Sequence, residues 1–559
     1  MMSLNTQAPA TLHERLSSLA ATRPDAPAVV DLSAVGGGHC TTYGELAERA
    51  SRSAAFLASL GVRRGDSVAT LLPNCQEWID LFFAAAQLGA LLVPLNTRYR
   101  SQEIGHLLRL SGARVLVTAT DFEGVNFTDR LAEVAAFEGD DAVPLKDIVI
   151  VSGDIEATPA RWQRHPGRDL SANAAPIPPA AGEPADPLIV FGTSGTTSAP
   201  KLAIHTHQTV LTHMDAVADR MRFSPDSSQL VVLSLSGTFG FVPFMAGLLA
   251  GQPATMLPIF KRERVLTALE SHPSDFLVAA EGSVRELLEA AGPADLGALN
   301  RIVTAGLAIE DIIDAATGRG ITAMNVYGSS EVFAFAAISE YGADTAVRAN
   351  PGGRVTGPDT LVRVTDPESG AVLPIGSVGE LQFSGPSVFS RYLHNDAATV
   401  ASRTPDGWFR TGDSARLIDD CTFTYLARAN DTLRLGGYSV SPSDVETTLE
   451  ELDGIRQAQV VGVRDTRSGD DLGVAFVIAE AGSDITPERV LEYCTERMAS
   501  FKVPKRVVMV NSYPSTPSAN GDKIRRDQLR DQATALLAEH PSTQPLRNAP
   551  ERLLQNEVH

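Results

Sequence analysis

The chain has 559 residues, 43% of them hydrophobic and 20% charged, a balance that indicates a globular protein large enough for several domains. The formal net charge of −20 at pH 7 argues against a nucleic-acid partner or an anionic membrane, because each requires a basic face. The four cysteines show no metal or redox spacing, and the longest apolar stretch, residues 81–95, is too short to span a bilayer. No signal peptide opens the chain, so we expect a cytoplasmic protein with reduced thiols.

The first part of the chain alternates helical and strand patterns. Helices are predicted at 46–60 and 78–89, and strands at 67–72 and 115–118. Such alternation predicts parallel α/β units. An Ala- and Pro-rich surface connection is predicted at 171–187.

A short apolar run at 188–190 predicts a strand, and the segment after it, F-G-T-S-G-T-T-S-A-P-K at 191–201, is rich in Gly, Ser and Thr. Backbone NH groups, small hydroxyls and a closing lysine suit an anion with many oxygens, such as a nucleotide polyphosphate. The segment lacks the G-K-S or G-K-T ending of a Walker loop. On its own it is also consistent with an ordinary surface loop.

More α/β pattern follows to about residue 340, and a β-rich subdomain is predicted at about 350–429. After that, strands and helices mix again in a compact unit at 430–531, and a weakly patterned tail occupies 532–559. The predicted fold class is therefore mixed α/β, with a large N-terminal domain at 1–429 and a small C-terminal α+β domain. The strands and helices expected beyond residue 350 are strands 362–364, 379–383, 422–425, 458–463, 474–478 and 506–510, and helices 443–452 and 487–499.

Four further segments accompany the loop at 191–201. They are V-Y-G-S-S-E at 326–331, G-W-F-R-T-G-D at 407–413, R-A-N-D-T-L-R-L-G-G-Y-S-V-S-P at 428–442 and N-G-D-K-I-R-R at 520–526. In this order and spacing, the five segments resemble the adenylate-forming superfamily, which comprises acyl- and aryl-CoA synthetases, adenylation domains of peptide synthetases and beetle luciferases. The resemblance runs from about Leu12 to Arg530.

The resemblance implies a nucleotide site. Tyr327 would present its ring to adenine, Ser330 would hydrogen-bond the α-phosphate, and Asp413 would accept hydrogen bonds from both ribose hydroxyls. Glu331 matches the family's Mg²⁺ ligand, in a site that phosphate oxygens would complete. The implied nucleotide-binding residues are Thr193, Ser194, Gly195, Thr196, Thr197, Tyr327, Gly328, Ser329, Ser330, Asp413 and Arg428.

The resemblance also implies a mobile small domain with its hinge at Asn430. In one state, Lys523 would stabilise negative charge as the carboxylate attacks the α-phosphorus, with Lys201 as a second catalytic lysine. In the other state the turn at Gly436 and Gly437 would admit the pantetheine arm of CoA. A glycine pair is also consistent with a simple turn.

Three positions depart from the family pattern. Ser198 and Leu202 replace glycines beside the phosphate loop, and Asp522 stands where a glycine usually precedes the lysine. Loss of glycine adds bulk where the backbone must approach phosphate. One hypothesis is that ATP-dependent adenylation is weakened, and the alternative is drift that a tolerant loop accepts.

Gly237 occupies a position where the family commonly has His or another aromatic residue at the wall of the acyl pocket. Gly237, Gly240 and Gly247 would each open space there, and together with the apolar run from Phe239 to Leu249 they suggest a bulky, largely apolar acid. Glycines that ease helix packing are the alternative interpretation. The implied substrate-binding residues are Gly237, Phe239, Gly306 and Val332.

The resulting prediction is an AMP-forming acyl-CoA synthetase that uses ATP, Mg²⁺, CoA and a carboxylic acid. There is also a weak similarity to natural-product ligases, including those for terpenoid acids. Three alternatives stay open: an enzyme that mainly forms the thioester from an adenylate supplied by another enzyme, an adenylation enzyme that loads a carrier protein, and a non-catalytic nucleotide-binding module.

Overall fold

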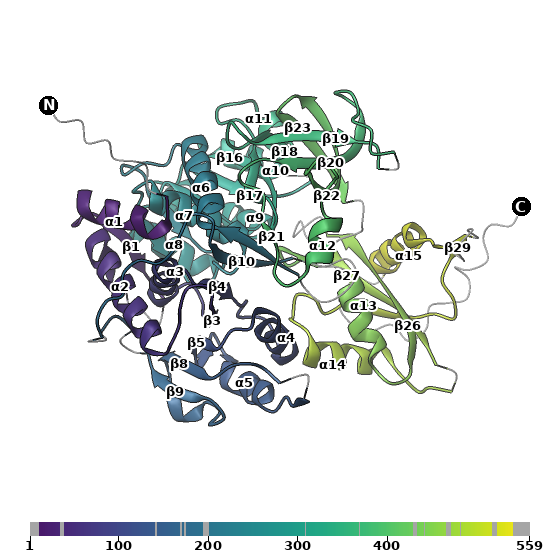
Figure 1. Ribbon diagram of the computed structural model, residues 1–559. Coiled ribbons are helices and arrows are strands. Elements are labelled where there is room, and N and C mark those ends of the chain that lie inside the picture. Colours follow the sequence, from purple (N-terminus) through teal and green to yellow (C-terminus); the bar gives the residue numbers. More distant parts are fainter. Residues whose placement is uncertain are drawn as a thin grey trace, which may run out of the picture. The chain divides into compact units, whose positions relative to one another are not determined.

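The structure is a computed structural model (Figure 1). It describes residues 10–33, 38–139, 142–167, 170–172, 175–193, 201–307, 309–367, 369–428, 433–440, 442–465, 471–480, 482–516 and 523–539. The chain forms two compact units. The larger comprises Met1–Thr97, Ile104–Thr193 and Leu202–Ala427, and the smaller comprises Arg98–Glu103, Ser194–Lys201 and Arg428–His559.

The first sheet of the larger unit has eight strands in the order β21-β11-β10-β4-β3-β5-β8-β9. Strands β10, β4, β3, β5, β8 and β9 pair in parallel, as the alternating pattern predicts. The strands are β3 (Ser67–Leu71), β4 (Leu91–Pro94), β5 (Val115–Ala119), β8 (Asp147–Ser152), β9 (Gln163–Pro166), β10 (Pro187–Thr193), β11 (Lys201–Thr206) and β21 (Arg391–Tyr392). The helices in this part of the chain are α2 (Tyr43–Ser59), α3 (Gln76–Leu88), α4 (Ser101–Ser111) and α5 (Phe127–Ala135).

The second sheet has thirteen strands in the order β19-β20-β22-β23-β18-β17-β16-β15-β14-β12-β13-β1-β2. Its parallel part contains β1 (Pro27–Asp31), β12 (Gln229–Val231), β13 (Ala254–Met256), β14 (Phe276–Val278), β15 (Arg301–Thr304) and β16 (Thr322–Ser329). Its antiparallel part contains β17 (Phe333–Ile338), β18 (Gly352–Val355), β19 (Leu361–Thr365), β20 (Val378–Ser384), β22 (Phe409–Asp419) and β23 (Thr422–Arg428), and β2 (Cys40–Thr42) is also antiparallel to β1. The sheet thus changes from parallel to antiparallel pairing between β16 and β17.

Among the described residues, the larger unit also contains helices between strands, two short strands and short 3-10 turns. They are α1 (Leu12–Thr22), α6 (His207–Met221), α7 (Thr238–Leu249), α8 (Arg262–Ser271), α9 (Glu281–Ala290), α10 (Glu310–Thr317), α11 (Thr345–Ala349), α12 (Asp396–Ala401), β6 (Asp121–Phe122), β7 (Val125–Asn126), η2 (Ile155–Ala157), η3 (Leu170–Ala172) and η4 (Pro293–Leu296). Helices α1 and α2 begin with capping boxes, in which Thr11 and Thr42 pair with Glu14 and Glu45.

The smaller unit is an α+β domain in which β26 (Ile455–Arg464), β27 (Asp471–Ala479) and β28 (Arg506–Met509) form one sheet. Figure 1 shows α13 (Pro442–Glu450), α14 (Pro487–Arg497) and α15 (Arg526–Glu539) around it. The described part of this unit also contains two antiparallel strand pairs: β24 (Leu433–Leu435) with β25 (Tyr438–Val440), and β29 (Ser515–Thr516) with β30 (Lys523–Ile524). Helix α15 extends beyond residue 531, where the sequence pattern weakens, because Leu529, Ala533 and Leu536 are its buried residues against β26 to β28.

In the described part of the chain, no helix combines the length and the apolar character that crossing a bilayer demands.

Candidate active site

The segment V-Y-G-S-S-E at 326–331 lies where the thirteen-stranded sheet changes direction, at the carboxyl end of β16. The carboxyl ends of parallel strands are where open α/β sheets bind ligands. A Cβ on Gly328 would lie 2.2 Å from the carbonyl oxygen of Phe333 in β17. Only glycine allows the two backbones to approach this closely, so Gly328 shapes the turn.

Tyr327 and Asp413, both predicted to bind the nucleotide, are neighbours. The tyrosine hydroxyl donates a hydrogen bond of 2.5 Å to Oδ2 of Asp413, and both residues are buried. The ring of Tyr327 lies parallel to that of Phe383, with centroids 5.9 Å apart, and Phe423 meets it edge-on. Tyr327 is therefore a core residue, and it also lies beside Asp413, the residue predicted to bind the ribose. Its contact with adenine stays a prediction.

Glu331 is held by two hydroxyl groups. The hydroxyl of Tyr392 donates to Oε1 at 2.8 Å, and the hydroxyl of Ser329 donates to Oε2 at 2.9 Å. A carboxylate offers about four lone-pair positions, so roughly two remain for other ligands. This donor set fits the predicted Mg²⁺ site, in which one carboxylate and phosphate oxygens would share the ion.

The segment 326–331 is bonded to both strands that flank the phosphate loop. The hydroxyl of Ser330 donates to the carbonyl of Gly192 in β10 at 2.9 Å, and Nε2 of His205 in β11 donates to the carbonyl of Ser330 at 2.8 Å. Thr193 is the last residue of β10, and Lys201 is the first of β11. The predicted loop residues Ser194, Gly195, Thr196 and Thr197, and the departure Ser198, lie outside the described residues.

Leu202 is the departure whose surroundings the structure describes. Its side chain is 3% exposed, within β11, and its carbonyl accepts a hydrogen bond from the amide of Leu393. The extra bulk at this position is therefore absorbed by the protein core. This favours the interpretation of Leu202 as tolerated drift.

Two histidines outside the sequence motifs, His205 of β11 and His213 of α6, pack against the turn. The ring of Phe333 is stacked against the rings of His205 and His213, with centroids 3.7 and 4.9 Å apart. Nε2 of His213 donates to the carbonyl of Ala334 at 2.8 Å. Burial lowers the pKa of His205 to about 3 and that of His213 to about 4, so both rings are neutral at pH 7. Phe333 itself has a φ of 64°, which is rare for a residue with a side chain.

The glycines of the predicted acyl pocket differ in their surroundings. A Cβ on Gly240 would lie 2.3 Å from the carbonyl oxygen of Ser234, and one on Gly247 would lie 2.2 Å from the side chains of Gln229 and Gln252. A Cβ on Gly237 would meet one atom, at 3.9 Å. The suggestion that all three open space is therefore wrong for Gly240 and Gly247, which allow close packing of α7, whereas Gly237 has free space beside it.

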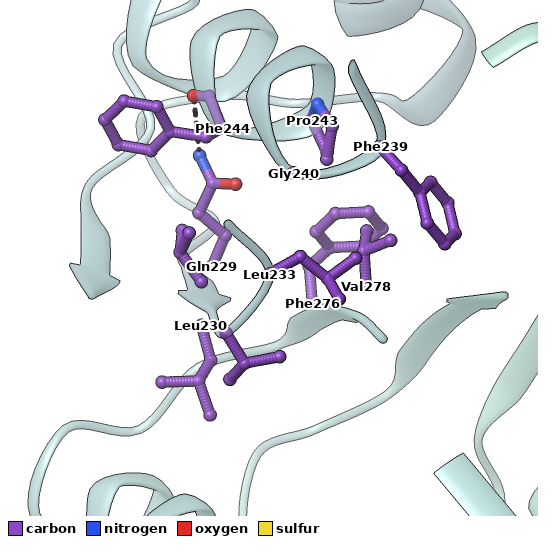
Figure 2. A pocket seen from close by; sticks show the side chains of 11 residues that line it. Gln229, Leu230, Leu233, Phe239, Gly240, Pro243, Phe244, Phe276 and Val278 are labelled. Atoms are coloured by element: carbon purple, nitrogen blue, oxygen red, sulfur yellow. Dashed lines mark hydrogen bonds between the residues drawn. The ribbon is translucent and has the colours of Figure 1, made fainter. Parts of the chain in front are cut away.

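A small cavity of about 10 Å³, with room for about one water molecule, lies between α7 and strands β12 and β14. Figure 2 shows Phe239, Gly240 and Pro243 of α7 on one side and Phe276 and Val278 of β14 on the other. Gln229 is a polar residue at its edge, and its Nε2 donates to the carbonyl of Phe244 at 3.1 Å. Of the predicted substrate residues, Phe239 lines this pocket.

The other predicted substrate residues, Gly306 and Val332, lie elsewhere in the larger unit. Asn325 holds Gly306 through both its amide and its carbonyl, and a Cβ at this position would lie 2.6 Å from Oε2 of Glu281. Val332 is buried in the core that also contains Tyr327.

In the smaller unit, Gly436 and Gly437 form the exposed turn between β24 and β25, with φ angles of 58° and 79°. This conformation favours glycine, so a turn requirement explains both residues and is compatible with the predicted CoA role. Lys523 begins β30, and Arg428 ends β23. Asn430 and Asp522 lie outside the described residues.

Two family models match this chain. The model described as AMP-binding enzyme matches residues 16–393, and the one described as AMP-binding enzyme C-terminal domain matches residues 444–520. The chain belongs to the AMP-binding enzyme family. One similar protein is 4-coumarate–CoA ligase 2 of Oryza sativa subsp. japonica. It is 31% identical to this AMP-binding enzyme, and the match covers 94% of this chain and 92% of the relative.

Two bacterial relatives also match nearly end to end. Feruloyl-CoA synthase of an Amycolatopsis species is 31% identical and covers 88% of this chain and 94% of its own. The second is a CoA ligase of Rhodococcus jostii (strain RHA1), whose name describes a propanoyl group on a methyl-dioxo-octahydro-indenyl ring system. It is 29% identical, and the match covers 90% of this chain and 96% of the relative.

The fold of this AMP-binding enzyme matches solved structures. The amide bond synthetase McbA from Marinactinospora thermotolerans aligns with a TM-score of 0.78 at 26% identity, covering 93% of this chain and 99% of that one. A mutant of o-succinylbenzoate CoA synthetase from Bacillus subtilis aligns with a TM-score of 0.78 at 22% identity, and the alignment covers 92% of this chain and 98% of that one.

Proposed function

We propose that this AMP-binding enzyme is an AMP-forming acyl-CoA synthetase that acts on a bulky, largely apolar carboxylic acid. The observation that carries the proposal is the hydrogen-bonded set at the change of sheet direction. There, Tyr327 meets Asp413, Ser330 meets the strand before the phosphate loop, and two hydroxyls hold Glu331. The relatives named as CoA ligases, which match along nearly the whole chain, support the same reaction.

In the first step a carboxylate oxygen of the acid attacks the α-phosphorus of ATP, and the bond to pyrophosphate breaks. Asp413 would accept hydrogen bonds from the ribose, and Ser330 would turn its hydroxyl towards the α-phosphate. Lys523 would stabilise the negative charge that develops on the transferring group. Glu331 would hold Mg²⁺, which neutralises phosphate charge when bound.

In the second step the sulfur of CoA attacks the acyl carbon, and AMP leaves with the electron pair of the broken carbon–oxygen bond. Adenylation makes this displacement feasible because AMP is a far better leaving group than oxide. The glycine turn at 436–437 would give the pantetheine arm room to enter.

The size and polarity of the acid are proposed from the larger unit. Gly237 leaves space beside it, and the side chains of Phe239, Phe276 and Val278 around the small cavity are apolar. Relatives named for ring-bearing acids support a bulky substrate. A panel of acids tests this directly: we expect ring-bearing acids to be used at least tenfold better than acids of four carbons or fewer, and the reverse order would overturn it.

The alternatives concern the adenylation step and the acceptor. A weakened adenylation step rests on Ser198 and Asp522, because Leu202 is accommodated by the core. A carrier-protein acceptor stays open, because the phosphopantetheine arm of a carrier protein presents the same thiol as CoA. The joint presence of Lys523, Glu331, Asp413 and Arg428 argues against a non-catalytic role.

A pair of rates on one acid separates these possibilities. The first is AMP and pyrophosphate release from ATP, and the second is thioester formation from the pre-made adenylate with free CoA. Both rates are expected to be substantial. A fast second rate with a negligible first would establish the weakened variant, transfer only to a carrier protein would establish that acceptor, and no turnover in either assay would refute the proposed function.

A further inference from the structure

Tyr392 is separated from the metal-binding candidate Glu331 by 61 positions in sequence, and it lies outside the five segments that carry the family resemblance. It is one of the two residues of strand β21, which pairs with β11 so that Tyr392 lies opposite Ala203. Hydrogen bonds from the amides of Ser390 and Leu393 to the carbonyls of Ile204 and Leu202 fix this register on both sides. The tyrosine thus rests on the strand that directly follows the phosphate loop.

The segment that carries Tyr392 makes two hydrogen bonds to Glu331. The amide of Phe389 donates to the backbone carbonyl of Glu331 at 2.7 Å, and the hydroxyl of Tyr392 donates to Oε1 of its carboxylate at 2.8 Å. The rings of Phe389 and Tyr392 pack together, with centroids 4.7 Å apart. Arg403 also stabilises this segment, because its guanidinium donates a hydrogen bond of 2.7 Å to the carbonyl of Phe389.

The opposite carboxylate oxygen is fixed by Ser329. Its hydroxyl donates to Oε2 and accepts a hydrogen bond from the amide of Glu331, at 2.9 and 3.2 Å. With a donor on each oxygen, the carboxylate has no freedom to rotate without breaking a hydrogen bond. Glu331 is 7% exposed and Tyr392 4%, so water is a poor substitute for either partner.

We infer that Tyr392 is a positioning residue for Glu331: its hydroxyl orients the carboxylate so that the remaining lone pairs face a divalent cation bound with the nucleotide phosphates. The inference rests on the proposed function, since it requires Mg²⁺ and ATP to bind together. Partners that orient a metal ligand typically contribute 10–100-fold to metal affinity. The phenyl ring alone, with its packing on Phe389, does not supply this effect.

The test uses the full chain and four forms of it: the wild type, Tyr392→Phe, Ser329→Ala and Tyr43→Phe. Calorimetry measures the affinity for ATP at a series of free Mg²⁺ concentrations. These measurements give the Mg²⁺ concentration at which half of the maximal gain in ATP affinity is reached. Tyr43 provides the matched control, because its hydroxyl also makes a buried hydrogen bond, to the carbonyl of Leu248 at 2.6 Å, in another part of the larger unit.

Tyr392→Phe is expected to raise the half-maximal Mg²⁺ concentration about tenfold, while ATP binding without Mg²⁺ stays unchanged. Ser329→Ala is expected to raise it in the same direction, and Tyr43→Phe is expected to leave it within twofold of the wild type. A shift below twofold in Tyr392→Phe, or an equal shift in Tyr43→Phe, would overturn the inference.

The same samples separate this inference from the proposed function. If the wild type releases AMP with an acid and CoA but Tyr392→Phe shows no Mg²⁺ shift, the positioning role alone is wrong. If the Mg²⁺ shift is present but no form releases AMP, the positioning role stands and the synthetase activity is wrong. If the wild type does not bind ATP in the presence of Mg²⁺, both are wrong.

Discussion

The segment at 326–331 and the glycine-rich segment at 237–247 were both identified from sequence, yet their residues differ in what surrounds them. In the first, polar groups have partners from distant segments: Asp413, Gly192, His205 and Tyr392. In the second, similar glycines divide between close packing and open space. Residues with functional groups thus carry chemical information by their type, whereas a glycine carries it only through its neighbours.

The largest expected effect is on the first segment. Glu331→Gln keeps the size of the side chain but removes the charge that a cation needs, so adenylate formation should fall about 100-fold or more. Pyrophosphate exchange with a good acid measures this rate. Thioester formation from the pre-made adenylate should change much less, and an equal loss in both rates would mean that Glu331 serves the fold rather than the phosphates.

The second effect divides the glycines. Gly240→Ala places a methyl group against the carbonyl of Ser234, and overpacking of this kind should lower the free energy of unfolding by about 1–3 kcal/mol. Gly237→Ala should lower it by less than about 1 kcal/mol, because the site is open and the one cost is that alanine is a poorer N-cap residue for α7 than glycine. Urea unfolding of both variants measures the difference. Equal losses of unfolding free energy in the two variants would show that Gly237 and Gly240 are packed alike.

The third effect concerns pH and the histidines beside the first segment. Burial depresses the pKa of His205 and His213 in the folded state, so the unfolded chain binds more protons below pH 6.5. Their contribution to stability is therefore present above pH 6.5 and is lost as pH falls towards about 4. Between pH 7 and pH 5, each histidine should reduce the free energy of unfolding by about 2 kcal/mol.

The variant His213→Gln tests this prediction, because an amide can donate to the carbonyl of Ala334 but does not titrate. Its stability should depend less on pH than that of the wild type. Parallel curves for the two proteins over pH 5–7 would show that His213 titrates normally in the fold.

The smallest effect is on substrate choice. Gly237→Trp should fill the open space and reduce kcat/KM for ring-bearing acids about tenfold, with little change for short acids. Rates on a matched pair of long and short acids check it. If both acids lose activity equally, Gly237 lies outside the acyl pocket.

The parallel α/β pairing and the elements of the smaller unit could be predicted because they depend on local periodicity. The order of the motifs predicts a nucleotide-binding role for the segment at 326–331, and its hydrogen bonds to Asp413 and Gly192 are compatible with that role. Tyr392 and His205 could not, because each acts through a contact between segments that lie 61 and 125 positions apart. The environments of Gly237 and Gly240 could not either, since a glycine has no side chain whose character would indicate its surroundings.

The burial of Leu202 has a consequence for anyone who wishes to engineer faster adenylation by restoring family glycines. Because its side chain is 3% exposed within β11, Leu202→Gly would leave an empty volume in the core and cost several kcal/mol of stability. A gain at the phosphate loop would then be masked by loss of folded enzyme. Repair should therefore begin at Ser198, and Leu202 should be left in place.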